Sequence, residues 1–192
     1  MVRAILREVD PKTMTRRVIK IPKQGRIKPA SHYRMGGVSI CFDQSGLAEW
    51  EILKSPYQVG DHLWVKETWA YYPASLPEEN HILYKADIPE GHHNRLTEIT
   101  KWRSGRFMFK KYSRLWLEVT GVKVERLQDI SEEDAVKEGT PINDFFPLNT
   151  ARIAGLTTVD YFVELWDSIN KKHPWESNPW CFAYTFKRIK CP

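Results

Sequence analysis

The chain has 192 residues, of which 42% are hydrophobic, and its 29 Lys and Arg outnumber its 24 Asp and Glu by five charges. Its 8 Trp, 8 Tyr and 8 Phe supply enough apolar surface for a core, which excludes a wholly disordered chain. A mildly basic, aromatic-rich chain is typical of proteins that bind nucleic acids, although an ordinary soluble protein can carry the same excess.

The first third of the chain has little periodicity. Residues 2–7 predict a short helix, and residues 15–21 predict a short strand. Residues 22–57 contain Pro and Gly without a clean period, so we expect a long excursion there, with a hairpin near 38–43 and 47–53.

Strand patterns dominate the middle of the chain. Apolar and polar residues alternate over 62–68, directly after a Gly-Asp turn, and predict a strand. A second strand is predicted at 81–87, and residues 114–127 have the longest strand pattern of all.

The last third contains two helix patterns and a strand pattern. Ser131 is a candidate N-cap for a short helix over 131–138. Apolar residues at helical spacing predict an amphipathic helix over 157–172, and alternation predicts a strand over 179–190. Five or six short strands with interleaved helices indicate an α+β fold built on a small mixed β-barrel. A doubly wound sheet is excluded, because regular strand–helix alternation and a Gly-rich first turn are both missing.

Neither the cysteines nor the histidines form a metal-binding motif. Cys41, Cys181 and Cys191 are odd in number and widely spaced, and the six His include no H-E-x-x-H motif. We therefore expect no metal and no cofactor. The chain has no signal peptide and no long apolar run, which predicts a cytoplasmic protein without a membrane partner.

The segment KTMTRR at residues 12–17 combines cations and hydroxyls. Lys is a weak base at its ordinary pKa, and Thr is a poor nucleophile until a base takes its proton, so Lys12 and Thr15 suit catalysis only if they are enclosed. The alternative is an exposed basic turn that binds phosphate or nothing. Glu138 ends the predicted short helix, where the helix dipole opposes its charge and so suits an acid role; for a lone Glu, however, a solvated helix end is the favoured alternative.

Two other segments mix rings with charge. In WVKETW, residues 64–69, Trp69 is a candidate for stacking on a base, and core packing is the alternative. In residues 102–114, rings interleave with basic residues as in surfaces that bind single strands, and a solvated loop is the alternative.

Several ordered blocks resemble the ASCH-domain proteins of the PUA-like superfamily, in particular the phage and prophage type. The resemblance covers residues 2–189 and implies one domain over 1–192, with loop insertions at about 22–55 and 140–156. The blocks are RAIL, KTMTRRVIK, PYQVGDHLWVKETWA, YKAD, LEVTGVKVERLQDISEEDAVKEG and NPWCFAYTFKRI.

The resemblance implies a barrel with flanking helices and a cleft for RNA, other single-stranded nucleic acid or a modified nucleoside. Some relatives are amidohydrolases that deacetylate N(4)-acetylcytidine. Carried over to this chain, their roles make Lys12 the proton acceptor, Thr15 the nucleophile and Glu138 the proton donor. We expect the substrate-binding residues to be Arg16, Arg17, Lys66, Glu67, Trp69, Arg103 and Arg106. A non-catalytic RNA- or DNA-binding module and a metal-independent ribonuclease are the alternatives.

Overall fold

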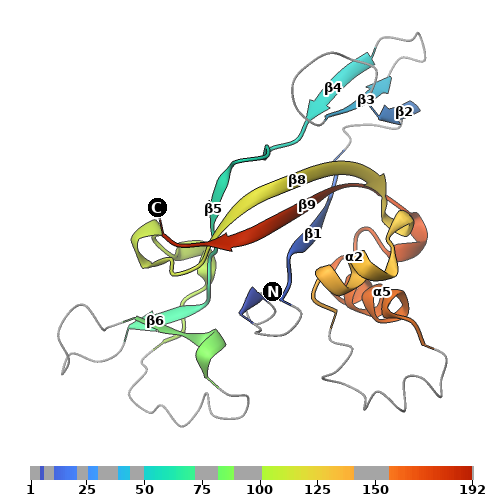
Figure 1. Ribbon diagram of the computed structural model, residues 1–192. Helices are drawn as coiled ribbons and strands as arrows, with labels where there is room; N and C mark the ends of the chain where they lie inside the picture. Colours follow the sequence, from blue (N-terminus) through green and yellow to red (C-terminus); the bar gives the residue numbers. More distant parts are fainter. Residues whose placement is uncertain are drawn as a thin grey trace. The chain divides into compact units, whose positions relative to one another are not determined.

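A computed structural model describes residues 5–6, 11–20, 26–29, 39–43, 50–71, 82–88, 101–140 and 156–191. The chain forms two compact units, one made of residues 3–61 and 119–187 and the other of 62–118 and 188–192. The fold is mixed α+β and is built on a curled antiparallel sheet (Figure 1). No helix in the described part of the chain combines the length and apolar character that a membrane crossing needs.

The main sheet of the first unit contains the strands with the clearest sequence patterns. Strand β1 (Met14–Val18) pairs antiparallel with β9 (Trp180–Ile189), and β9 neighbours β8 (Trp116–Arg126). Figure 1 shows β8 and β9 as long curved ribbons with β1 alongside. The predicted strands at 114–127 and 179–190 are confirmed, and the one predicted at 15–21 is shorter and starts one residue earlier.

A second sheet contains β2 (Arg26–Pro29), β3 (Ser39–Asp43) and β4 (Trp50–Lys54) in antiparallel order. It confirms the hairpin predicted within the excursion. The described residues hold nine strands, in sheets of four, three and two, so the prediction of five or six was too low. The strands that no sequence pattern predicted, β2 and β6, are four and three residues long, too short to show a period.

Helices α2 (Glu132–Lys137) and α5 (Thr158–Ile169) each begin after a capping residue, and the cap of α2 is the predicted Ser131. Helix α2 starts after Ser131, whose Oγ accepts the Asp134 amide at 3.1 Å, and Glu138 is its C-cap. Gly139 follows with φ 78°, a left-handed conformation that favours glycine and ends the helix. Helix α5 starts with a capping box between Thr157 and Asp160.

The core of the first unit joins both helices to the sheet. Phe162 and Trp166 lie one turn apart on α5 and pack against Ala135 of α2 and Cys181 of β9. Burying each large apolar side chain contributes about 1.5–3 kcal/mol, so this cluster fixes α2 and α5 against β9. Its remaining members are Leu127 of η5 (Leu127–Asp129) and Ile130, with Trp175 of η6 (Trp175–Ser177) at its edge.

The second unit has shorter elements. Strand β5 (His62–Trp64) pairs with the first residues of β8, and β6 (Trp69–Tyr71) pairs with β7 (Ile82–Tyr84). The strand predicted over 62–68 therefore ends at Trp64, although its alternation continues. The described residues of this unit also form three 3-10 turns: η2 (Lys85–Asp87), η3 (Gly105–Phe107) and η4 (Lys110–Tyr112).

Close backbone contact explains why the ladder stops at β5. A Cβ on Gly105 would lie 2.9 Å from the carbonyl oxygen of Glu67, so η3 packs directly on the chain at that point. The buried side chains of Val65 and Glu67 still alternate with the exposed Lys66 and Thr68. The alternation thus records burial by a neighbouring loop, which sequence alone does not distinguish from burial in a sheet.

Two predictions fall largely on other parts of the chain. The helix at 2–7 and the insertion at 140–156 lie mostly outside the described residues. The single domain over 1–192 stays a prediction.

Candidate functional site

Lys12 and Glu138, which are 126 residues apart in sequence, meet in the first unit. Lys12 Nζ donates to Glu138 Oε2 at 2.7 Å and also to the Glu138 backbone oxygen. Two backbone bonds bring them together: the Thr13 amide donates to the Lys137 oxygen at 2.9 Å, and the Phe186 amide donates to the Thr13 oxygen at 2.8 Å. The start of β1 is therefore held between α2 and β9.

Burial changes the acid–base chemistry of this pair. Lys12 and Glu138 are both buried. Burial lowers the pKa of the Lys12 ammonium below its ordinary value, although the Glu138 carboxylate acts in the opposite direction. Arg16 and Arg17 add to the lowering, since like charges disfavour the protonated form. A lysine with a lowered pKa is better suited to accept a proton than an exposed one.

Arg16 lies at the centre of a network of charged side chains. Its side chain is wholly buried, and it contacts three carboxylates: Glu138 Oε1 at 3.2 Å, Asp134 Oδ2 at 3.2 Å and Glu125 Oε1 at 2.5 Å. Lys123 closes the network from outside, 2.9 Å from Asp134 and 3.0 Å from Glu125. Arg16 was predicted to bind the substrate. In the structure its Nη1 and Nη2 are instead bound to carboxylates.

Asp134 connects this network to the surface. Burial acts to raise its pKa, but the Lys123 hydrogen bond and the charges of Lys123, Arg16 and Lys137 outweigh burial, so that the pKa is lowered. Asp134 therefore stays ionised well into the acid range and contributes an attractive charge to Arg16.

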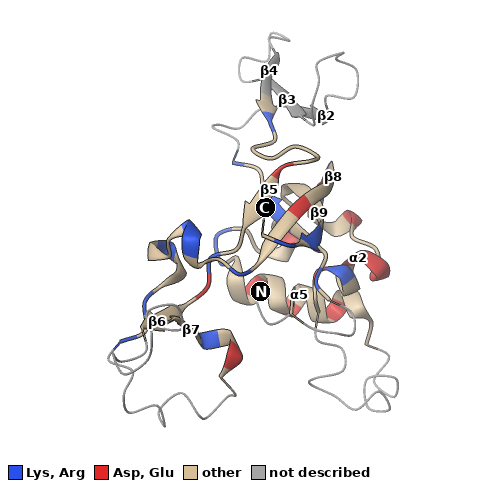
Figure 2. Cartoon of the chain, turned by 60° about the vertical axis from the view of Figure 1, so that its left-hand side comes forward, with Lys and Arg blue, Asp and Glu red and all other residues tan. Residues whose placement is uncertain are grey.

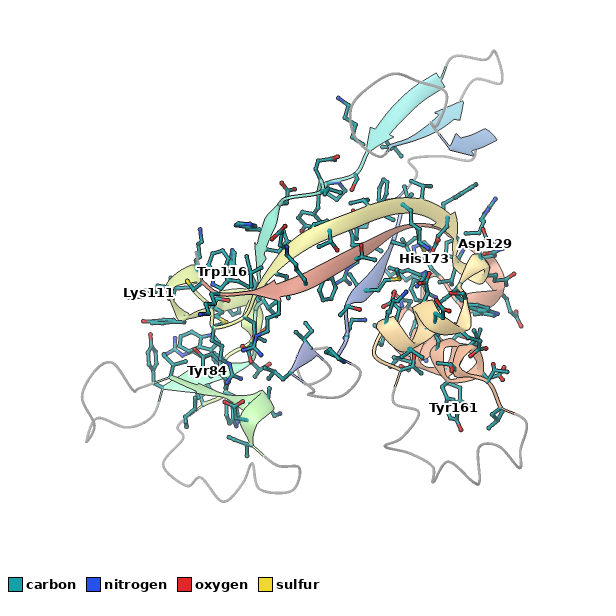
Figure 3. The ribbon with its side chains drawn as sticks, in the orientation of Figure 1. Tyr84, Lys111, Trp116, Asp129, Tyr161 and His173 are labelled. Carbon is teal, nitrogen blue, oxygen red and sulfur yellow. The ribbon has the colours of Figure 1, made fainter. Side chains whose placement is uncertain are left out.

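A cavity of about 340 Å³ opens beside the Lys12–Glu138 pair. One side is polar and includes Thr15 and Arg17, and the other is formed by apolar residues of α5. Trp166 is fixed in this wall because its Nε1 donates to the backbone oxygen of His173, labelled in Figure 3, at 2.8 Å. The lining residues are Lys12, Thr15, Arg16, Arg17, Glu138, Gly139, Phe162, Leu165, Trp166, Ile169 and Asn170.

The structure brings the three residues predicted as catalytic to one cavity. Thr15 is half-buried on β1, opposite Tyr184 of β9, and lines the cavity with Lys12 and Glu138. Cys181, also in β9, is a poor competitor as nucleophile, because burial raises the pKa of its thiol to about 12.

Glu67 and Trp69, in the second unit, are buried in ways that differ from the predicted contact with a substrate. Glu67 is 1% exposed and accepts two bonds from Arg114, at 3.0 and 2.9 Å. Trp69 is 0% exposed and packs against Tyr71 and Tyr112 at centroid distances of 4.9 and 5.4 Å. Its ring leaves no face for a base, so the core-packing alternative holds.

The remaining predicted binding residues of the second unit have exposed side chains. Lys66 Nζ lies 5.0 Å from the ring centroid of Trp64. Arg103 lies over the rings of Trp69 and Tyr71 at 5.3 and 5.0 Å, and Arg106 is exposed in η3. These cations remain candidates for contact with an anion.

Sequence reasoning missed most of the residues that surround the pair. Glu125 and Asp134 belong to the charged network, and no local pattern distinguishes them from other surface acids. The apolar stripe of α5 did give a signal, but it predicted core packing alone, whereas Leu165, Trp166 and Ile169 also line the cavity. Within the described residues, no group of three or more His, Cys, Asp or Glu is placed to hold a metal ion.

Compared with protein-family models, with curated proteins and with solved structures, the chain shows no match.

Replacing Arg16 should destabilise the protein strongly. Arg16→Met leaves three buried or half-buried carboxylates without their shared cation, which costs about 3–5 kcal/mol. Arg17→Met, on the same strand but exposed, is the matched control and should change the free energy of unfolding by less than about 0.5 kcal/mol. Urea denaturation measures both, and equal effects would contradict the central place of Arg16.

The Asp134 charge should make stability fall in acid. Its folded pKa is lowered, so its contribution is complete above the ordinary Asp pKa of about 3.9 and is lost as pH falls through the lowered value. The stability difference between wild type and Asp134→Asn should therefore be larger at about pH 5 than at about pH 3. Thermal unfolding across this range tests it, with the exposed Glu133→Gln as control. A difference that does not depend on pH would refute the assignment.

Proposed function

We propose that this chain is an ASCH-type amidohydrolase that deacylates an N-acylated cytosine nucleoside, such as N(4)-acetylcytidine. The observation that carries the proposal is the 2.7 Å contact between Lys12 and Glu138 beside a cavity that Thr15 also lines. The burial of Lys12 and Glu138 supports an enclosed Lys–Thr site over the alternative of an exposed basic turn.

The proposed reaction begins with a proton shift within the pair. One proton passing from Lys12 Nζ to Glu138 Oε2 gives a neutral amine and a carboxylic acid, and burial, which lowers the pKa of Lys12, favours the neutral amine. Lys12 then has the lone pair that a base requires, and Glu138 has the proton that an acid requires. The Lys12–Glu138 hydrogen bond therefore provides both the general base and the general acid of the scheme.

Thr15 supplies the nucleophile. Its Oγ attacks the amide carbonyl while Lys12 accepts the hydroxyl proton, and Glu138 protonates the exocyclic amine as the C–N bond breaks. The proton on Lys12 then returns to Glu138, which restores both neutral groups. Water attacks the acyl ester on Thr15 while Lys12 accepts a proton from it; the C–O bond to Thr15 breaks, Lys12 passes that proton to Thr15 Oγ, and the carboxylic acid leaves. The scheme uses no metal and no cofactor.

The apolar wall suits the substrate that this scheme requires. Trp166 and Leu165 of α5 present apolar surface opposite the polar residues of β1, so a flat base or an acyl group can lie against them. Arg16 has an indirect role in the scheme, since its bond to Glu138 Oε1 leaves Oε2 directed to Lys12.

Conservative substitutions test the nucleophile. With N(4)-acetylcytidine as substrate and chromatography to detect cytidine, Thr15→Val should reduce turnover to background, while Thr15→Ser retains a hydroxyl and measurable activity. Thr13→Val is the matched control, because Thr13 lies two residues away and outside the cavity lining. Lys12→Ala should lower kcat by about 10²-fold or more. No turnover by wild type, or turnover that survives Lys12→Ala, would sink the proposal.

A second candidate function, binding of single-stranded nucleic acid, is favoured by a surface of the second unit. Phe107 is 68% exposed and Phe109 is 59% exposed. Residues 101–114 contain six Lys or Arg and no Asp or Glu, drawn in Figure 2 with Lys and Arg in blue. Lys111 of η4, labelled in Figure 3, has its Nζ 4.9 Å from the ring centroid of Tyr112. Exposed rings beside cations are the arrangement on which unpaired bases stack.

Removing one ring should weaken this binding. Phe107→Ala should reduce the affinity for a single-stranded oligonucleotide by about 1–3 kcal/mol, the usual worth of one base–ring stack. Tyr57→Ala, an exposed ring of the first unit, is the control. Fluorescence anisotropy at several salt concentrations measures both, since phosphate contacts weaken as salt rises. Unchanged affinity in Phe107→Ala would count against this candidate.

A further inference from the structure

Within the described part of the chain, Arg17 is the cation of the cavity lining that no carboxylate matches. It lies on β1 opposite Phe182, its side chain is exposed, and it lines the cavity beside Lys12 and Thr15. Among the residues that the structure describes, none forms an ion pair or hydrogen bond with it. An unmatched guanidinium at the rim of a cavity is available to a ligand.

The charges on the other lining residues are balanced from within. Glu138 is bound to both Lys12 and Arg16, and Arg16 is further matched by Glu125 and Asp134. Lys123 and Lys137 contact the same carboxylates from outside. Arg17 therefore adds a net positive charge to the rim, and a concave site with low-dielectric walls strengthens the attraction of such a charge for an anion.

The chemistry of the Arg17 guanidinium limits the class of ligand that it can bind. Arginine presents a planar fork of donors that binds two oxygens of one phosphate or carboxylate at once. A cavity of about 340 Å³ is within the usual size for a small-molecule site. It has room for a base against the α5 wall with an anionic group at the rim.

We propose that Arg17 binds the phosphate of a cytosine nucleotide, so that the cavity takes a nucleoside monophosphate or a nucleotide end in preference to a neutral nucleoside. The choice of cytosine rests on the proposed function; the preference for an anion rests on Arg17 and its exposed, unmatched guanidinium. In this arrangement Arg17 determines substrate class, while Lys12, Thr15 and Glu138 contact the amide.

Binding of cytidine 5′-monophosphate, cytidine and inorganic phosphate, measured by isothermal titration calorimetry on the full chain, tests the proposal without requiring turnover. Wild type should bind the nucleotide about tenfold more tightly than the nucleoside at low salt, a gain typical of one charge-assisted contact. Arg17→Gln should abolish this difference. Lys20→Gln, which removes an exposed positive charge outside the cavity lining, should preserve it.

Three results would overturn the proposal: equal binding of nucleotide and nucleoside by wild type, an equal loss in Lys20→Gln, or no binding of either ligand. Inorganic phosphate binding as tightly as the nucleotide would show a site for a free oxyanion and overturn the nucleotide assignment. An Arg17-dependent preference without hydrolysis of N(4)-acetylcytidine would support the nucleotide site and remove the amidohydrolase proposal. Hydrolysis of N(4)-acetylcytidine without a preference for the nucleotide would support the amidohydrolase proposal and remove the nucleotide site.

Discussion

The buried charge of Arg16 constrains the rest of the first unit. A guanidinium removed from water is stable only when carboxylates surround it, and here these come from β8 and from α2 with its C-cap. Pairing this one guanidinium with carboxylates therefore requires both β8 and α2 to stand at fixed distances from β1. The ion pairs of Arg16 fix the position of α2. The hydrophobic cluster supplies most of the free energy of unfolding.

The position of the Lys12–Glu138 pair follows from the position at which the Arg16 ion pairs hold α2. Ser131 fixes where α2 begins, Gly139 fixes where it ends, and Arg16 holds Glu138 Oε1, so that Oε2 is turned to Lys12. A shift of α2 by one residue would move Glu138 about 100° around the helix axis and away from β1. Local helix signals and a buried ion network thus act together on one carboxylate.

The second unit also contains an arginine that pairs with carboxylates from separate segments. Arg114 binds Glu67 through Nε and Nη2, binds Asp87 at 2.6 and 2.8 Å, and lies 3.9 Å from the ring centroid of Tyr84, labelled in Figure 3. This fork joins the start of β8 to the segment after β5 and to η2. Each unit therefore contains an arginine that joins segments remote from one another in the sequence.

The sequence by itself determined the local elements, because their signals act within a few residues. These elements are the N-cap of α2, the apolar stripe of α5, the long alternations of β8 and β9, and the hairpin within 22–57. The resemblance named Lys12, Thr15 and Glu138 but not their distance. Only the tertiary structure decided that Lys12 meets Glu138 across 126 residues, that Arg16 is buried while Arg17 is exposed, and that Trp69 has no free face. Burial and charge pairing depend on segments that are remote in the chain. A local sequence pattern does not indicate which remote residue a side chain will contact.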